Sequence, residues 1–184
     1  MLAMDARRSG CGHALVLLRK IVTGGQTGVD RAALDAALAS QFPCGGWCPA
    51  DRSAEDGVIP ATYPLTPLPG GGLRERTRQN VIDSDGTLIV CDGTLTGGEL
   101  TGGTQLTWRV AQEQGRALLV IDAAKFPVGR AAEAVIAWIN TSGIEVLNVA
   151  GPRESGWAQA YAYTREVIGM VLQSASDPAE RSEQ

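Results

Sequence analysis

The sequence predicts an α/β fold in which a doubly wound, mostly parallel sheet carries helices on both faces. Short apolar runs alternate along the chain with longer segments whose apolar residues recur at helical spacing. Many of the 23 glycines fall in short clusters that follow apolar runs, not in a flexible tail. Alternating strands and helices indicate βαβ units, whose parallel strands end at one edge of the sheet. Ligand-binding loops of such folds gather at that edge.

The first half of the chain contains two predicted strands, two predicted helices and a long loop. A strand is expected over 19–23, where an apolar run ends at a pair of glycines, and a helix over 30–40, where alanines and leucines form one apolar stripe. A short second strand is expected over 45–48. The segment 49–72 holds five prolines and few apolar runs, which predicts mostly loop. A helix follows over 74–84.

The second half continues the alternation with clearer signals. The apolar run 87–91 predicts a buried strand, and 104–114 a helix that a glycine terminates. A strand is then expected over 117–121, and a helix over 128–140, where aliphatic residues lie on one side. The last strand is expected over 145–149.

The chain is expected to form one domain with loose ends. Its 184 residues, 44% hydrophobic and 20% charged, are ordinary for a single globular domain. Residues 1–17 are predicted to be a loose leader, because their apolar stretch is too short for a signal peptide. The domain itself spans 18–173 and closes with a helix over 157–172. Residues 174–184 are polar and predict a disordered tail.

Charge and composition exclude several classes of function. The formal net charge is -4 and there is no basic run, so a nucleic-acid partner is not expected. No apolar run reaches the length of a membrane span, and a cytoplasmic location is expected. The one histidine, His13, lies in the leader, which argues against histidine acid–base chemistry. The four cysteines show no disulfide or zinc spacing, so no metal site is predicted.

The first candidate binding motif joins the strand 19–23 to the helix 30–40. Glycines let a chain turn sharply and expose consecutive amide groups, and the start of the next helix favours an anion. A tight turn without a ligand is the alternative interpretation. The predicted phosphate-binding residues of this motif are Gly24, Gly25, Gln26, Thr27 and Gly28.

The second candidate motif lies between the strand that ends at Cys91 and the helix 104–114. It combines glycines with threonine hydroxyls and predicts another anion-binding loop, unless it is only a mobile surface loop. If both loops follow neighbouring strands, they could flank one ligand at the switch point of the sheet. The predicted site residues here are Asp92, Thr101, Gly102, Gly103 and Thr104.

Two further motifs contribute candidates. Asn148, Gly151 and Ser155 follow the last strand, where Ser155 could also cap the final helix and Arg153 could pair with a phosphate or be solvated. On the helix 74–84, Arg78 and Asn80 are candidates, although such charges usually form a solvated face. Near the expected cleft, several carboxylates could each act as a base: Asp30, Asp85, Asp92 and Glu99.

These motifs together resemble the molybdenum-cofactor carrier protein family. The resemblance rests on GGQTGVDRAALD at 24–35, GWCP at 46–49 with Arg52, and EDG at 55–57. It continues through ERT at 75–77, SDGT at 84–87, GGT at 102–104 and NVAGPRES at 148–155, and so spans roughly residues 20 to 172.

The resemblance implies a Rossmann-like fold, related to the group that was labelled lysine decarboxylases and includes cytokinin-activating phosphoribohydrolases. It implies a homo-oligomer, a dimer or tetramer, that binds and protects molybdenum cofactor without catalysis and passes it to molybdoenzymes. The two glycine loops would meet the phosphate, and Trp47 and Arg52 would cover the organic part. Thr107 stands where the enzymatic relatives would carry a catalytic glutamate, which argues against their hydrolysis reaction.

Three ligand classes fit this pattern. The first is molybdenum cofactor, a molybdopterin-type compound anchored by its phosphate. The second is a nucleotide, bound by a regulatory sensor or cleaved by a nucleoside-monophosphate phosphoribohydrolase. The third is a bare oxyanion such as molybdate, because amide-lined loops bind tetrahedral anions in general.

Overall fold

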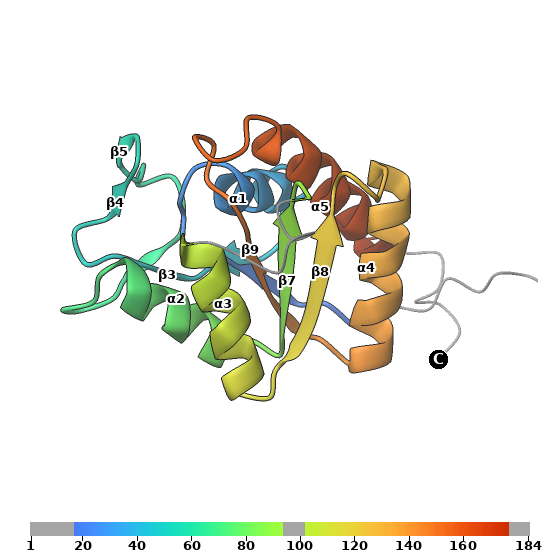
Figure 1. The fold of residues 1–184 in the computed structure, drawn as a ribbon, viewed down its shortest axis with the longest axis horizontal. Coiled ribbons are helices and arrows are strands. Elements are labelled where there is room, and N and C mark those ends of the chain that lie inside the picture. The colour runs from blue at the N-terminus through green and yellow to red at the C-terminus, as the bar shows by residue number, and fades with distance from the viewer. Residues whose placement is uncertain (1–16, 94–101, 177–184) are drawn as a thin grey trace, which may run out of the picture.

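The structure, a computed structural model, describes residues 17–93 and 102–176 and is an α/β fold with a central five-stranded parallel sheet (Figure 1). The strand order is β2-β1-β9-β7-β8, and every neighbouring pair is parallel. The predicted fold class is therefore confirmed. The sheet strands are β1 (Lys20–Val22), β2 (Cys44–Gly45), β7 (Gly86–Cys91), β8 (Ala117–Asp122) and β9 (Val146–Ala150).

The last strand of the chain lies in the middle of this sheet. β9 pairs with β1 on one side, where Ile21 is opposite Leu147, and with β7 on the other, where Leu88 is opposite Val149. β1 and β7 are thus not neighbours, contrary to the arrangement considered from the sequence. Consequently the loop after β9 begins between the carboxyl ends of β1 and β7.

Helices cover both faces of the sheet (Figure 1). α1 (Val29–Ala39), α4 (Val128–Ser142) and α5 (Ala160–Ser176) pack together on one face, and α2 (Leu73–Ile82) and α3 (Gly102–Glu113) pack against each other on the other. The main core lies under the first group, where fully buried aliphatic side chains meet the strands. A smaller cluster lies between α2, α3 and β8.

The strand predicted over 45–48 is two separate strands. β2 ends at Gly45 and pairs with β1, whereas β3 (Trp47–Cys48) pairs with β6 (Thr66–Pro67) outside the central sheet. The break is at Gly46, whose φ of 124° is open to glycine and strained for other residues. A side chain there would also collide with the main chain of Thr23.

The segment predicted as loop, 49–72, also contains short strands. β4 (Ser53–Ala54) and β5 (Gly57–Val58) form a two-stranded antiparallel hairpin, which stands apart from the central sheet at the upper left of Figure 1. Strands of two residues leave too little periodicity to detect in a sequence. The tip of this hairpin, Glu55 and Asp56, contacts the site described below.

Several helix ends differ from the prediction. α5 begins at Ala160, three residues later than expected, and runs to Ser176, so the first residues of the predicted tail are helical. Ser155 therefore does not cap this helix, because four residues separate it from the first helical position. The predicted leader up to residue 16, the rest of the tail and Thr101 lie outside the described residues.

The described residues contain neither a membrane-spanning helix nor a cluster of metal-ligating side chains. No helix within 17–93 or 102–176 is long and apolar enough to cross a membrane. No group of three or more histidine, cysteine, aspartate or glutamate side chains in those ranges could hold a metal ion.

Candidate anion-binding site

A cavity of about 680 Å³ opens at the carboxyl edge of the sheet. Its walls come from the β1–α1 loop, the ends of β7 and β9, and the first turns of α2 and α3. The residues that line it are Gln26, Asp30, Leu73, Arg74, Arg76, Thr77, Cys91, Asp92, Gly102, Gly103, Thr104, Gln105, Leu106, Thr107, Arg109, Ala150, Gly151, Pro152, Arg153 and Gly156.

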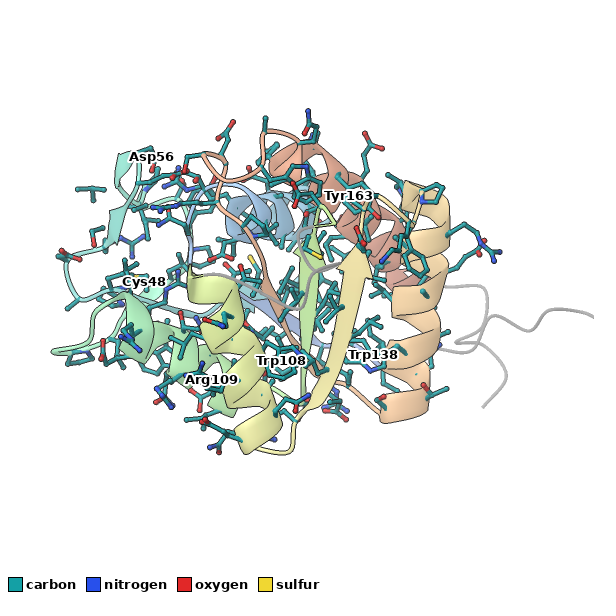
Figure 2. All side chains as sticks on the ribbon, in the orientation of Figure 1. Cys48, Asp56, Trp108, Arg109, Trp138 and Tyr163 are labelled. Atoms are coloured by element: carbon teal, nitrogen blue, oxygen red, sulfur yellow. The ribbon has the colours of Figure 1, made fainter. Side chains whose placement is uncertain are left out.

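The charged side chains on this cavity are mainly cationic. Four arginines line it, against two aspartates, Asp30 and Asp92. Arg74 and Arg109 are exposed at the rim, and no hydrogen bond or ion pair joins either to another described residue. Figure 2 shows Arg109 on the side of α3 that faces α2. A guanidinium group binds phosphate or a similar oxyanion through two parallel hydrogen bonds, so the cavity favours an anion.

Arg76 is the arginine held most firmly in the wall. Its Nη1 lies 3.3 Å from Oδ2 of Asp30, and both side chains are largely buried, with 14% and 5% of their surfaces exposed. The guanidinium occupies the place where a side chain at Gly24 would stand. Burial raises the pKa of Asp30, although the Arg76 charge and the amide groups of Gln26 and Gly24 act in the opposite direction.

Two buried polar atoms of the cavity residues have no hydrogen-bond partner among the described residues. They are Nε of Arg76, a donor, and Oδ1 of Asp92, an acceptor. Buried polar groups in native proteins are almost always paired, and those at a cavity are commonly completed by water or a ligand. Both atoms are closed to solvent, so they lie within the cavity wall and do not face its open space.

The N-terminal turn of α3 supplies the second predicted motif. Gly102, Gly103 and Thr104 all line the cavity, as the sequence predicts for an anion-binding helix start. Thr107 faces the same space one turn later, and its hydroxyl donates to the carbonyl of Gly103 at 2.9 Å.

The first predicted motif is arranged differently from an open phosphate-binding loop. Its amide groups already have partners in the chain: Gly25 donates to Thr23 Oγ1 at 3.2 Å, Gln26 to Asp30 Oδ2 at 3.2 Å, and Thr27 to Gln26 Oε1 at 3.0 Å. Only the side of the loop that carries Gln26 and Asp30 reaches the cavity. In this structure, side-chain oxygens of the protein itself accept the hydrogen bonds that these amides were expected to donate to an anion.

Gly28 and Gly151 lie where the loop after β9 packs closely against the start of α1. At Gly28 φ is 72°, and a Cβ would stand 2.6 Å from the carbonyl oxygen of Pro152. Gly151 approaches Val29 and the main chain of Val90 in the same manner. These contacts bring the loop after β9 against the start of α1, which forms one wall of the cavity.

Glu55 joins three loops beside the cavity. Its carboxylate accepts hydrogen bonds from the Thr27 hydroxyl and from the Ser155 hydroxyl, the latter at 2.5 Å, and lies 3.4 Å from Nε of Arg153. Desolvation acts to raise the pKa of Glu55, but the hydrogen bonds from Ser155 and Thr27 outweigh it and hold the pKa below its ordinary value. Glu55 thereby fixes the β4–β5 hairpin to the loops after β1 and β9.

The structure places several sequence-predicted residues away from the cavity. Trp47 and Asn80 bind each other: the Trp47 amide donates to Asn80 Oδ1 at 2.8 Å, and Asn80 Nδ2 donates to the Trp47 carbonyl at 2.9 Å. Arg78 lies 3.8 Å from Glu113 on the exposed side of α2. Asn148 is buried against Thr87.

The Arg52 side chain binds main-chain carbonyls of the protein itself and does not line the cavity. Its guanidinium donates to the carbonyls of Leu65 at 2.9 Å, Pro60 at 3.0 Å and Ile59 at 3.2 Å. These bonds close the segment 52–65 on itself. Cys48 lies beneath, in a small apolar cluster, and burial raises the pKa of its thiol.

The remaining candidate bases differ in whether the structure places them at the cavity. Asp85 accepts the amides of Glu145 and Val146 at the opposite, amino edge of the sheet, so it is not part of the cavity. Asp92 lines the cavity as predicted. Glu99 and Thr101 lie outside the described residues.

Sequence reasoning missed Arg74, Arg76, Arg109 and Glu55 as site residues. Thr77, Asn80 and Val81 form the buried side of α2, and Arg76 and Arg78 flank it from opposite directions, so helical spacing alone does not choose between the two arginines. Glu55 belongs to the EDG motif at 55–57, but nothing in that motif indicates its partners, which lie 28 and 100 residues away.

Fold and site together define a doubly wound α/β protein with an arginine-lined cavity at the carboxyl edge of its sheet. Residues 21–172 match the circularly permutated YpsA SLOG family, and the chain belongs to that family.

The chain is also similar to a solved structure. This is a crystal structure from Syntrophus aciditrophicus SB named "putative molybdenum carrier protein", with 40% sequence identity and a TM-score of 0.79. The match covers 85% of this chain and 96% of that one. Among curated proteins, none matches this chain significantly.

Proposed function

We propose that the protein binds molybdenum cofactor, a molybdopterin-type compound with a terminal phosphate, as cargo in the arginine-lined cavity. The observation that carries the proposal is the cluster of Arg74, Arg76, Arg109 and Arg153 around one space at the carboxyl edge of the sheet. The name of the similar crystal structure supports molybdenum-related cargo. The cargo would be held with its phosphate toward these arginines.

The chemistry of the cavity fits such a cargo. Guanidinium groups, the start of α3 and the Thr104 side chain supply donors for phosphate oxygens. A volume of about 680 Å³ accommodates an organic cofactor and exceeds what a single oxyanion needs.

We further propose that the cargo is carried without chemical conversion. Supporting this, the position that faces the cavity one turn into α3 is Thr107, whose hydroxyl is engaged with the Gly103 carbonyl. A hydroxyl held in that way is a poor general acid or base.

A second candidate, cleavage or sensing of a nucleotide, has one observation in its favour. Asp30 is a buried carboxyl group on the cavity wall whose pKa is raised by burial, which is the property of a general acid. Its Oδ2 is already bonded to Arg76 and to the Gln26 amide, so Oδ1 would have to act. For this reason the carrier function is preferred.

The test is calorimetric titration of the purified protein with molybdenum cofactor, AMP and molybdate in parallel. Cofactor binding well above that of AMP, and weakened by Arg76→Ala, supports the carrier proposal. The matched control is Arg130→Ala, because Arg130 is an exposed arginine on α4 that pairs only with Glu133 nearby. Absence of saturable cofactor binding rejects the proposal, and tighter binding of AMP with release of free base favours a hydrolase.

A further inference from the structure

We infer that the Glu55 carboxylate occupies a second oxyanion site beside the cavity, and that a phosphate group competes with Glu55 for this site and releases the β4–β5 hairpin. The site is formed by the loops after β1 and β9. The inference goes beyond the proposed function, because the site shares only Arg153 with the cavity and does not depend on which cargo the cavity holds.

Four donors from two loops converge on this one carboxylate. Oε1 of Glu55 accepts from the Thr27 hydroxyl and from the Ser155 amide at 3.2 Å, and Oε2 accepts from the Ser155 hydroxyl at 2.5 Å. Nε of Arg153 lies 3.4 Å from Oε2. Hydroxyls, main-chain amides and guanidinium groups are the donors with which proteins bind phosphate oxygens. The set therefore suits an oxyanion, and a carboxylate of the protein itself fills it.

The Thr27 hydroxyl is oriented toward the position that Glu55 fills. Its oxygen accepts the amide of Glu154 at 3.2 Å, so its proton is directed at the Glu55 carboxylate. Thr27 and Ser155 were both candidates for phosphate binding in the sequence, and the structure brings them together at this point. Glu55, 28 residues from one and 100 from the other, occupies the position of the expected anion.

The hairpin that carries Glu55 is held to the rest of the molecule mainly by polar contacts. Besides the contacts of the Glu55 carboxylate, Arg31 pairs with Asp56, and Gln26 Oε1 accepts the Glu55 amide at 2.9 Å. Val58 on β5 is 73% exposed, and the hairpin stands apart from the central sheet (Figure 1). Segments that bury little apolar surface open at a low cost in free energy.

Opening of the hairpin makes the donors accessible to a ligand. Arg153 and Ser155 are exposed residues, whereas the Glu55 side chain is only 17% exposed and covers the donors that it contacts. A phosphate group binds the open state alone, so its affinity is lowered by the fraction of molecules in that state. Phosphate binding and attachment of the hairpin therefore oppose each other.

The first experiment measures hairpin opening in the full-length wild-type protein at constant neutral pH. Amide hydrogen exchange of residues 53–58 is followed while inorganic phosphate or AMP is added, with sodium chloride at equal ionic strength as the control for screening. We expect exchange to rise by about threefold or more near saturation, because the bound anion shifts the population to the open state. Release by inorganic phosphate assigns the site to the free anion, and release by AMP alone assigns it to a phosphate ester. Unchanged exchange with both, or an equal rise with chloride, overturns the inference.

The second experiment locates the site by calorimetry with inorganic phosphate. Glu55→Ala removes the internal competitor and should tighten phosphate binding by about tenfold, as expected for a site that is open in about a tenth of the molecules. The matched control is Glu154→Ala, which removes an exposed carboxylate from the loop after β9 and should change affinity by less than about twofold because of screening. The gain should vanish in Glu55→Ala with Ser155→Ala, since Ser155 does not line the cavity.

Glu55→Gln keeps the shape of the side chain and should give a smaller gain in the same direction, so it carries the test if Glu55→Ala does not fold. No gain, an equal gain in Glu154→Ala, or a gain that Ser155→Ala leaves intact overturns the inference. Failure of the carrier proposal looks different: molybdenum cofactor would not bind, while phosphate would still compete with Glu55.

Discussion

The guanidinium of Arg76 fills the space beside Gly24, and its Nη1 lies 3.3 Å from Oδ2 of Asp30. This contact joins α2 to the first turn of α1 in the cavity wall. A side chain at position 24 would collide with this guanidinium, so glycine is required there. Asp30 thus binds the Arg76 cation at the place where the glycine motif alone suggested a phosphate.

Arg76→Ala should weaken binding of phosphate esters by about tenfold or more, because it removes a buried charged donor from the cavity. It should also lower the free energy of unfolding by about 3 kcal/mol, since Asp30 is left buried without its partner. Calorimetry and urea denaturation measure the two effects. Arg78→Ala, which removes a cation from the exposed side of α2, should change affinity less than twofold; a larger effect for Arg78 would contradict the assigned helix face.

Arg52→Ala should reduce stability and leave ligand affinity almost unchanged. The side chain donates to the carbonyls of Ile59, Pro60 and Leu65, so its loss leaves these acceptors to water and loosens the segment 52–65. A decrease of about 2 to 3 kcal/mol in the free energy of unfolding is expected for bonds to a charged donor. Loss of affinity at unchanged stability would instead support the sequence-based expectation that Arg52 covers the ligand.

Gly28→Ala should destabilise the protein by about 2 kcal/mol or more, because φ is positive there and the new methyl group would meet the Pro152 carbonyl. Gly169→Ala is the matched control. Gly169 lies within α5, and a Cβ there meets no atom, so alanine should stabilise by about 0.5 to 1 kcal/mol. Equal effects of the two substitutions in thermal unfolding would count against the close loop packing.

Attachment of the β4–β5 hairpin should depend on pH through Glu55. Its pKa is lowered in the folded protein from an ordinary 4.5, so the contribution is complete above about pH 4.5 and is lost as pH falls through the lowered value. Amide hydrogen exchange of residues 53–58, measured between pH 3 and 6 and corrected for intrinsic rates, should show increased opening at the acid end.

Glu55→Gln provides the comparison for that measurement. Glutamine retains one acceptor for the Thr27 and Ser155 hydroxyls but cannot titrate, so opening of its hairpin should no longer change with pH between about 4 and 6. Below that range Asp56, whose pKa is lowered by its hydrogen bonds from Arg31, contributes in both proteins. A pH dependence that persists in Glu55→Gln would assign the effect to another carboxyl group.

Much of the architecture follows from local patterns. Apolar runs and helical periodicity predicted all five strands of the central sheet and all five helices among the described residues, because burial of one face imposes a period of two or 3.6 on any sequence. The edge of the sheet at which the cavity opens was also predictable, because the carboxyl ends of parallel strands lie on the same side. Gly102, Gly103, Thr104 and Asp92 were found in this way.

Other features depended on the three-dimensional arrangement. The central place of β9 cannot be seen in the local sequence. Strand order depends on how segments that are far apart in the chain pair with one another. Arg76 lines the cavity and Arg78 does not, because residues two positions apart point to different sides of a helix and only the packing of α2 decides which side faces the cavity.

The sequence by itself thus determined the fold class and the edge of the sheet at which the cavity opens, and it predicted that Gly102, Gly103 and Thr104 lie there. The tertiary structure alone decided which side chains meet there: Arg76 with Asp30, and Glu55 with Thr27 and Ser155. The reason is physical. Periodicity and turn chemistry act between residues a few positions apart, whereas a charged site is assembled from partners 28 to 100 positions apart that only the packed chain brings together.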